Sequence, residues 1–361
     1  MTAGGKTIAT LFEANGRFGP SFDIIRLFAA VLVLVSHSAV ITGRLIPNFT
    51  HSVVSLGAVA VAVFFVLSGF VITESVKRDG RPAAFLRKRA LRIYPALIVL
   101  VLLTVFVLGP LVTTLPLSAY FSGKATGLYL LNAVIPFNNA LPGVFETNPQ
   151  DIINGSLWTI RFEIVCYLAV ALFGSLFLAR PWIAIAIALG CGLAMETLLV
   201  AGHNPGTGFV MVQAYHGLTV TGYFFGGASL SLFAAKIPVG TAWIVAALAG
   251  LAAALASPAF FVLFPFVGAY LVVVLGNSRL LAFPAIRRGI LAGDFSYGFY
   301  LFAFPIQQLA YLWLGPSAGF WTVTFVSLPA VLALAMLSWH FIEKPALAFK
   351  HGGNNLIPRV A

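Results

Sequence analysis

Long apolar runs recur along almost the whole chain, and they constrain its fold more than any other feature. The chain has 361 residues, of which 60% are hydrophobic and only 9% are charged. A water-soluble domain averages about 25% charged residues and has no room inside for so much apolar surface. A run of about 20 apolar residues is long enough to cross the hydrocarbon core of a bilayer as one helix. The sequence therefore predicts an integral membrane protein.

Ten apolar runs are predicted to be transmembrane helices, which gives an all-α polytopic membrane fold. They lie near residues 22–42, 53–75, 93–113, 157–179, 181–202, 209–235, 241–256, 259–276, 290–315 and 319–343. A further segment near 122–136 is too short to span and is expected to lie in the membrane interface. Three regions follow from this prediction: an N-terminal cytoplasmic tail, a ten-helix membrane domain and a C-terminal cytoplasmic tail, at residues 1–21, 22–345 and 346–361.

Basic residues gather in the linkers after the even-numbered spans and after the last one. The chain carries 21 Lys and Arg against 10 Asp and Glu. In a soluble protein this excess would suggest nucleic acid, but here it reports topology, because cytoplasmic loops are enriched in Lys and Arg. The residues concerned are the basic ones of Lys77 to Arg92, then Arg180, Lys236, Arg279, Arg287, Arg288, Lys344, Lys350 and Arg359. Both termini are therefore predicted to be cytoplasmic (N-in, C-in), which leaves only Arg44, Lys124 and Arg161 toward the outside.

Arg26 and His37 are polar residues inside the first apolar run. They are 11 residues apart, which is about three helical turns, so both side chains share one face roughly 16 Å apart along the axis. A charged or titratable residue inside a membrane span is a functional candidate by default, and histidine is the usual general base near neutral pH. Two simpler interpretations stay open: Arg26 reaching the inner headgroups, and His37 hydrogen-bonded in the helix interior.

The fourth span opens with the stretch GSLWTIRFEIVCYL, Gly155 to Leu168. Thr159, Glu163 and Tyr167 are four residues apart and are predicted to form one polar stripe, with Arg161 pointing away from it. Glu163 is expected at a depth similar to that of His37. One interpretation is an ion pair that locks helices together. The other is a carboxylate that orients His37 and stabilises its protonated form.

Arg89 and Arg92 are three residues apart before the third span, so they are neighbours on one helix surface. Arginine suits bidentate phosphate contacts, although a cytoplasmic anchor is the simpler interpretation. Arg92 is also placed to pair with Glu343 at the inner end of the tenth span. Ser68 and Gly69 form a small patch in the second span that favours helix contact over catalysis.

Six motifs in order along the chain resemble the acyltransferase-3 family of membrane acyltransferases, which O-acetylates cell-surface polysaccharides and related glycans. They are Arg26 with His37, FFVLSGFVIT at 64–73, RALRIYPAL at 89–97, SLWTIRFEIVCYL at 156–168, FSYGFYLFAFPI at 295–306 and WHFIEKPA at 339–346. The resemblance implies a ten-span enzyme that uses cytoplasmic acyl-CoA.

The resemblance also implies residue roles. It casts His37 as the catalytic base and links Arg26, Arg89 and Arg92 to binding of the acyl donor. Glu163 as the partner of His37 is our own inference. Supporting residues from the same motifs are Ser68, Trp158, Arg161, Tyr297 and Glu343. One departure stands out: the family often has a histidine two residues before the proline of the ninth-span motif, where this chain has Ala303. Any role of that histidine is absent or passes to Gln307 or Gln308.

The expected function is transfer of an acyl group, in the first place acetyl, from acyl-CoA to a hydroxyl of a cell-surface or lipid-linked glycan. The expected partners are acyl-CoA, the glycan acceptor and membrane lipids of the cell (inner or plasma) membrane, with no nucleic acid. Acyl-CoA is a co-substrate, so no permanently bound cofactor is expected. No metal site is expected either, since no metal-ligand spacing such as C-x-x-C occurs. The alternative is a proton-coupled exporter of a small molecule or glycan, because buried His, Arg and Glu also suit that class.

Overall fold

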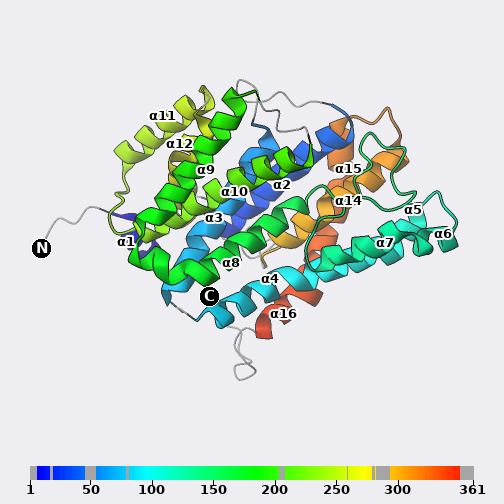
Figure 1. Ribbon diagram of the computed structural model, residues 1–361, viewed down its shortest axis with the longest axis horizontal. Coiled ribbons are helices and arrows are strands. Elements are labelled where there is room, and N and C mark those ends of the chain that lie inside the picture. Colours follow the sequence, from blue (N-terminus) through cyan, green and yellow to red (C-terminus); the bar gives the residue numbers. More distant parts are fainter. Residues whose placement is uncertain are drawn as a thin grey trace, which may run out of the picture. The chain divides into compact units, whose positions relative to one another are not determined.

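A computed structural model describes residues 6–16, 19–44, 54–78, 81–202, 208–257, 259–278, 281 and 293–349. These residues form helices and no β-strand; one isolated bridge joins Thr7 and Pro238 (Figure 1). Seven helical segments are long and apolar enough to cross a membrane: Phe22–Ile41, Leu56–Arg78, Pro82–Val112, Trp158–Ala179, Trp182–Val200, Phe260–Asn277 and Phe320–Ala348. An all-helical, multi-pass membrane fold is thereby confirmed. The linker residues Arg279, Arg287, Arg288, Lys350 and Arg359 lie outside the described residues.

The three remaining predicted spans are helical but less suited to crossing a bilayer alone. They are α10 (Phe209–Leu232), α11 (Thr241–Leu255) and α14 (Ser296–Leu314). The 15 residues of α11 reach only about 22 Å, short of a hydrocarbon core of about 30 Å. Polar side chains such as Gln307 and Gln308 lower the hydropathy of α14. The predicted count of ten spans therefore stays a prediction.

The chain divides into two compact units. The first comprises residues 1–36, 46–81 and 162–292. Its helices are α1 (Ile8–Ala14), most of α2 (Phe22–Ile41), α3 (Leu56–Arg78), most of α8 (Trp158–Ala179), α9 (Trp182–Val200), α10, α11 and α12 (Phe260–Asn277). Its centre is the close packing of α3 against α10, which lie side by side in Figure 1.

Glycines set how closely these helices of the first unit approach. A Cβ atom added to Gly69 of α3 would lie 1.9 Å from the carbonyl oxygen of Phe224 in α10. One added to Gly227 of α10 would lie 2.1 Å from the carbonyl oxygen of Val66 in α3. Small residues let helix backbones approach closely in membranes, where dispersion contacts take the place of the hydrophobic effect. The helix-contact interpretation of the Ser68–Gly69 patch is therefore confirmed at Gly69.

The second unit comprises residues 37–45, 82–161 and 293–361. Its helical elements are the end of α2, α4 (Pro82–Leu103), the π-helical turn η1 (Thr104–Leu108), α5 (Gly109–Val112), α6 (Leu117–Ser122), α7 (Lys124–Tyr129), the 3₁₀ turn η2 (Leu130–Ala133), the start of α8, α14, α15 (Phe320–Ser338), the π-helical turn η3 (Trp339–Glu343) and α16 (Lys344–Ala348). Helix α14 is its buried element and packs along α15.

Helix α7 and the turn η2 occupy most of the segment predicted to lie in the interface, and α6 comes directly before it. Helix α6 folds back onto the end of the α4 segment, where Phe106 stacks on Phe121 at 6.1 Å between ring centres. In the π-helical turn η1, the Val105 carbonyl accepts a hydrogen bond from a side chain outside the helix: the Tyr120 hydroxyl donates to it at 2.9 Å. Burial raises the pKa of Tyr120 to about 12, so this hydroxyl keeps its proton at neutral pH.

Candidate active site

His37 lies one turn before the end of α2, in the second unit. Its ring meets the ring of Phe304 from α14 edge to face, with centres 5.0 Å apart and planes at 75°. Its Nδ1 is buried and has no hydrogen-bond partner among the described residues. The imidazole therefore sits on an apolar wall with one nitrogen that the described protein groups leave unpaired. Such a nitrogen suits a group that exchanges a proton with a ligand.

Ser38, the next residue, hydrogen-bonds this end of α2 to two other helices. Its buried Oγ receives hydrogen bonds from Gln307 Nε2 of α14 at 2.5 Å and from Thr324 Oγ1 of α15 at 2.8 Å. Helix α2 then stops at a glycine cap, where Gly43 adopts φ 67° and the Arg44 amide donates to the Ala39 carbonyl. Sequence reasoning missed Ser38 and Thr324, although the serine adjoins the expected base.

The two glutamines that follow Ala303 in α14 serve different partners. Ala303 is buried and lies one turn before Gln307, the residue that contacts Ser38. Gln308 instead faces the loop before α8: its Nε2 donates to the carbonyls of Gln150 and Ile152, and its Oε1 accepts from Asn148. Of the two candidates to replace the family histidine, Gln307 is therefore the one that bonds to the neighbour of His37.

The loop before α8 also packs on α14 close to Phe304. Asn154 Nδ2 donates to the Leu301 carbonyl at 2.9 Å. A Cβ atom at Gly155 would lie 2.5 Å from the Phe304 ring, so only glycine fits there. Ile152 packs against a buried apolar cluster made by Ile41, Phe304, Ala310, Tyr311, Ala318 and Val323. Phe304 is thus held from the loop side while it contacts His37.

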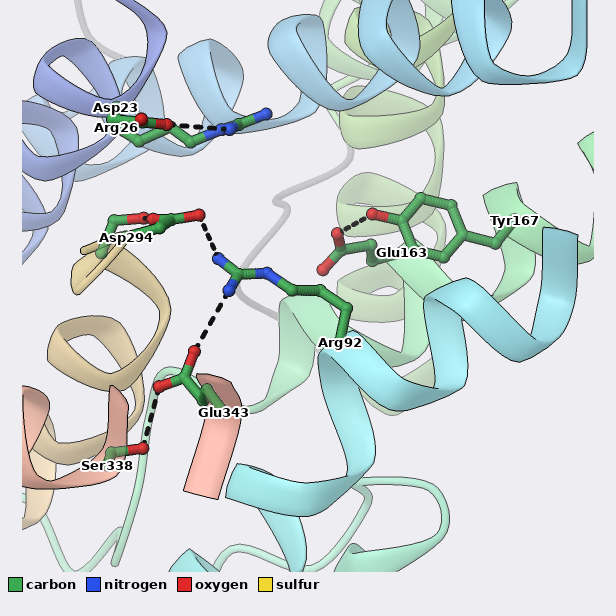
Figure 2. Close-up of polar contacts among 9 residues, drawn as sticks. Asp23, Arg26, Arg92, Glu163, Tyr167, Asp294, Ser338 and Glu343 are labelled. Carbon is green, nitrogen blue, oxygen red and sulfur yellow. Dashed lines mark hydrogen bonds and ion pairs between the residues drawn. The ribbon is translucent and has the colours of Figure 1, made fainter. Parts of the chain in front are cut away.

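Arg92 of α4 binds two carboxylates at once, as Figure 2 shows. Its Nη2 lies 2.6 Å from Asp294 Oδ2 and its Nη1 lies 3.2 Å from Glu343 Oε2. The pairing with Glu343 was predicted and is confirmed; Asp294 as a second partner was not foreseen. Tyr297 flanks the cluster, with its ring 5.4 Å below the guanidinium and its hydroxyl donating to the Ile93 carbonyl at 2.9 Å.

Arg26 and Arg89, the other two arginines assigned to the donor, lie in different units. Arg26 belongs to the first unit and forms a 3.7 Å ion pair with Asp23, one turn earlier on α2. Since α2 is one continuous helix from Phe22 to Ile41, Arg26 and His37 do share a helix face, as predicted. Arg89 lies on α4 in the second unit, with its guanidinium 6.0 Å from the centre of the Phe85 ring.

The residues of the polar stripe predicted on α8 hydrogen-bond to different partners. In the first unit the Tyr167 hydroxyl donates to Glu163 Oε1 (Figure 2). In the second unit the Thr159 hydroxyl bonds instead to the hydroxyl of Tyr300 in α14, at 2.8 Å. Arg161 is buried, and its guanidinium lies 5.0 Å from the centre of the Phe137 ring. The predicted pairing of Glu163 with His37 joins residues of different units and stays a prediction.

Two further supporting residues lie on α3 and α8. Ser68 is half-buried on α3 beside Gly69. Trp158 is half-buried and begins α8.

Sequence comparison now identifies the family. The acyltransferase-3 model, described as an acyltransferase domain, matches residues 20–340. The chain belongs to the acyltransferase-3 family. The match covers most of the chain, including every site residue above except Glu343.

Named relatives agree with this family. The chain is 28% identical to the O-acetyl transferase of Shigella phage Sf6, over 90% of this chain and 94% of the relative. It is 26% identical to acyltransferase MdmB of Streptomyces mycarofaciens, over 88% and 87%. It is also 26% identical to the exopolysaccharide production protein ExoZ of Rhizobium meliloti (strain 1021), over 87% and 94%. No solved structure matches the chain. This acyltransferase-3 member is thus an O-acyltransferase, and the enzyme interpretation prevails over the exporter.

Proposed function

We propose that this acyltransferase-3 protein moves an acyl group, in the first place acetyl, from cytoplasmic acyl-CoA to a hydroxyl of a cell-surface or lipid-linked glycan. The observation that carries the proposal is His37, whose enclosed Nδ1 has no partner among the described residues while Phe304 fixes its ring. The printed names of relatives, an O-acetyl transferase and an exopolysaccharide production protein, support the acetyl group and the glycan acceptor.

Acyl transfer from a thioester to a hydroxyl needs one base and involves no oxidation or reduction. His37 removes the proton of the acceptor hydroxyl as its oxygen attacks the thioester carbonyl carbon. The tetrahedral intermediate then collapses, the carbon–sulfur bond breaks, and the CoA thiolate takes the proton back from His37. The products are the O-acyl ester and free CoA. A base of this kind contributes about 10² to 10⁴ in rate.

Apart from Arg92, the remaining roles follow the sequence prediction. Arg26 and Arg89 are the donor-binding cations, and Glu163 stabilises the imidazolium of His37. The protein crosses the cell membrane ten times with both termini in the cytoplasm. The basic linkers then lie on the cytoplasmic side, where the acyl donor is. Residues 1–21 and 346–361 are the cytoplasmic tails of this arrangement.

Membranes that contain the protein, supplied with radiolabelled acetyl-CoA, test this function. We expect label in the lipid-linked or polysaccharide fraction, and its loss in His37→Ala with the protein still inserted. His340→Ala is the matched control, because His340 is exposed at η3, where its ring bonds to the Met336 carbonyl at 2.8 Å and lies 6.0 Å from the Phe295 ring. Near-normal transfer by His37→Ala would refute the role of this residue. Export of a solute without covalent label would refute the function itself.

A further inference from the structure

We propose that Arg92 is a positioning residue that clasps α4 to the start of α14 and to the end of α15, and that it does not bind the phosphates of the donor. This inference rests on the proposed function, in which the anionic acyl donor needs a basic site. The sequence prediction gave Arg26, Arg89 and Arg92 the same role in binding the donor. The inference removes Arg92 from that set.

Arg92 and its two carboxylate partners come from three separate places in the second unit (Figure 2). Arg92 itself lies on α4, Asp294 stands two residues before α14, and Glu343 ends η3. Two different nitrogens of the guanidinium bind the two carboxylates, at 2.6 Å and 3.2 Å. The planar fork of arginine suits such a bridge, since one rigid group can hold two acceptors in fixed directions.

All four carboxylate oxygens of this cluster have partners. Those not bound to Arg92 accept from serines: Ser296 Oγ donates to Asp294 Oδ1 at 2.6 Å, and Ser338 Oγ donates to Glu343 Oε1 at 2.8 Å. The backbone also makes room, since a Cβ atom at Gly298 would lie 3.0 Å from Glu343 Oε1. The carboxylates are therefore built into the fold and are not loose counterions.

The charges of the cluster oppose a phosphate ligand. One arginine faces two carboxylates, so the three side chains together carry a net charge of −1 when ionised. A phosphate would have to displace a carboxylate from the guanidinium. Glu343 is only 1% exposed, so the displaced carboxylate would be left buried and unpaired, which is costly.

The clasp acts on the proposed base through α14. It fixes the start of this helix at Asp294, and ten and thirteen residues later the same helix presents Phe304 to His37 and Gln307 to Ser38. That is a span of roughly 15 to 20 Å along one helix. Loosening the clasp should therefore misplace the base and lower the rate of transfer, while leaving donor affinity unchanged.

Binding and kinetics separate a clasp from a phosphate ligand. We would measure the Kd of the purified protein for CoA and for dephospho-CoA, which lacks the 3′-phosphate, together with kcat for acetyl transfer. Arg92→Gln should lower kcat about 10- to 100-fold, the cost of misplaced catalytic groups, and leave both Kd values within about twofold. Arg89→Gln should instead raise the Kd for CoA by about tenfold, as the loss of one charge-assisted contact does. Arg180→Gln, which removes an exposed charge at the end of α8, is the control and should change nothing. A tenfold rise in the Kd for CoA with Arg92→Gln would overturn the proposal.

A melting experiment in detergent, without substrate, tests the clasp even if the proposed function is wrong. Glu343→Gln should lower the melting temperature of the wild type but have little effect, or raise it, in the Arg92→Gln background, because it relieves repulsion between the two carboxylates. Additive losses would overturn the clasp. If Arg92→Gln does not fold, Glu343→Gln alone serves, since it keeps every arginine. A lower kcat with unchanged CoA affinity supports the clasp, whereas tighter CoA binding, by a released arginine, overturns it.

Discussion

Gln307 and Ser38 are joined by a 2.5 Å hydrogen bond, which ties α14 to the residue that follows His37. Both side chains are fully buried, and Thr324 shares the same serine oxygen at 2.8 Å. The end of α2 is therefore fixed to two helices at the position next to the proposed base. This bond exists in a chain where Ala303 occupies the place of a common family histidine.

Gln307→Leu should reduce acyl transfer more than it reduces stability. The variant keeps side-chain volume but removes the donor to Ser38, a loss of about 1 kcal/mol for a neutral hydrogen bond. We expect kcat to fall about tenfold or more through misplacement of His37, with the KM for acyl-CoA unchanged. Steady-state kinetics beside a melting curve check this. A variant with wild-type kcat would show that the bond serves only packing.

Phe304→Ala should damage both the fold and the activity. Removing a buried aromatic ring costs about 3–5 kcal/mol, and this ring contacts His37 and fills the space above Gly155. The measurement is thermal unfolding in detergent, followed by acyl transfer below the melting temperature. Phe325→Ala is the matched control, because that ring is 64% exposed on α15. Equal effects of the two substitutions would contradict a specific role of Phe304 in packing against His37.

Gly69→Ala should disrupt the first unit. The added Cβ would sit 1.9 Å from a carbonyl oxygen of α10, a clash with backbone that only separation of the helices relieves. We expect a lower melting temperature and lower yield in membranes. Gly190→Ala on α9 is the control, since among the described residues no atom beyond the adjoining turns of its own helix lies within 4 Å of its Cβ position, and it should be neutral or slightly stabilising. Tolerance of both changes would argue against the close contact of α3 and α10.

Tyr120→Phe should weaken the fold-back of α6 by about 1 kcal/mol, because the Val105 carbonyl of the π-helical turn loses its donor. The pKa of Tyr120 is raised by burial to about 12, above its unfolded value near 10. The wild type should therefore hold this stability below pH 10 and lose it as pH rises toward 12. Thermal unfolding against pH should show a smaller alkaline loss in the variant. Identical curves would remove Tyr120 from this role.

Much of the fold could be predicted because apolar runs report helices directly. Each of the ten predicted spans is helical in the structure, although α10, α11 and α14 are too polar or too short to stand out as spans on their own. The sequence also raised the pair Arg92 and Glu343, since burying one charge near a membrane demands an opposite one, and the structure shows the ion pair. Neither inference needed knowledge of how the helices pack.

The partners of His37 and Ser38 could not be predicted, because helix packing chooses them. Nothing in the spacing of α14 distinguishes Gln307 from Gln308, yet successive residues turn by about 100° and face different elements. The second carboxylate at Asp294 was missed for a similar reason: it precedes a helix, and its direction depends on the local backbone. The loop from Asn148 to Gly155 has no periodicity, so its packing onto α14 left no pattern to read.

The π-helical turn η3 makes the number of residues at the end of α15 as important as their chemistry. Ser338 and Glu343 are five residues apart, which in an α-helix would turn their side chains about 140° away from each other. The wider π turn brings them to one side, where they hydrogen-bond at 2.8 Å and present the glutamate to Arg92. A chain one residue longer here would keep every polar group and still separate them, whereas one residue fewer would leave them four apart, on one face of an ordinary α-helix. A one-residue insertion at this point should therefore be as harmful as loss of the charge itself.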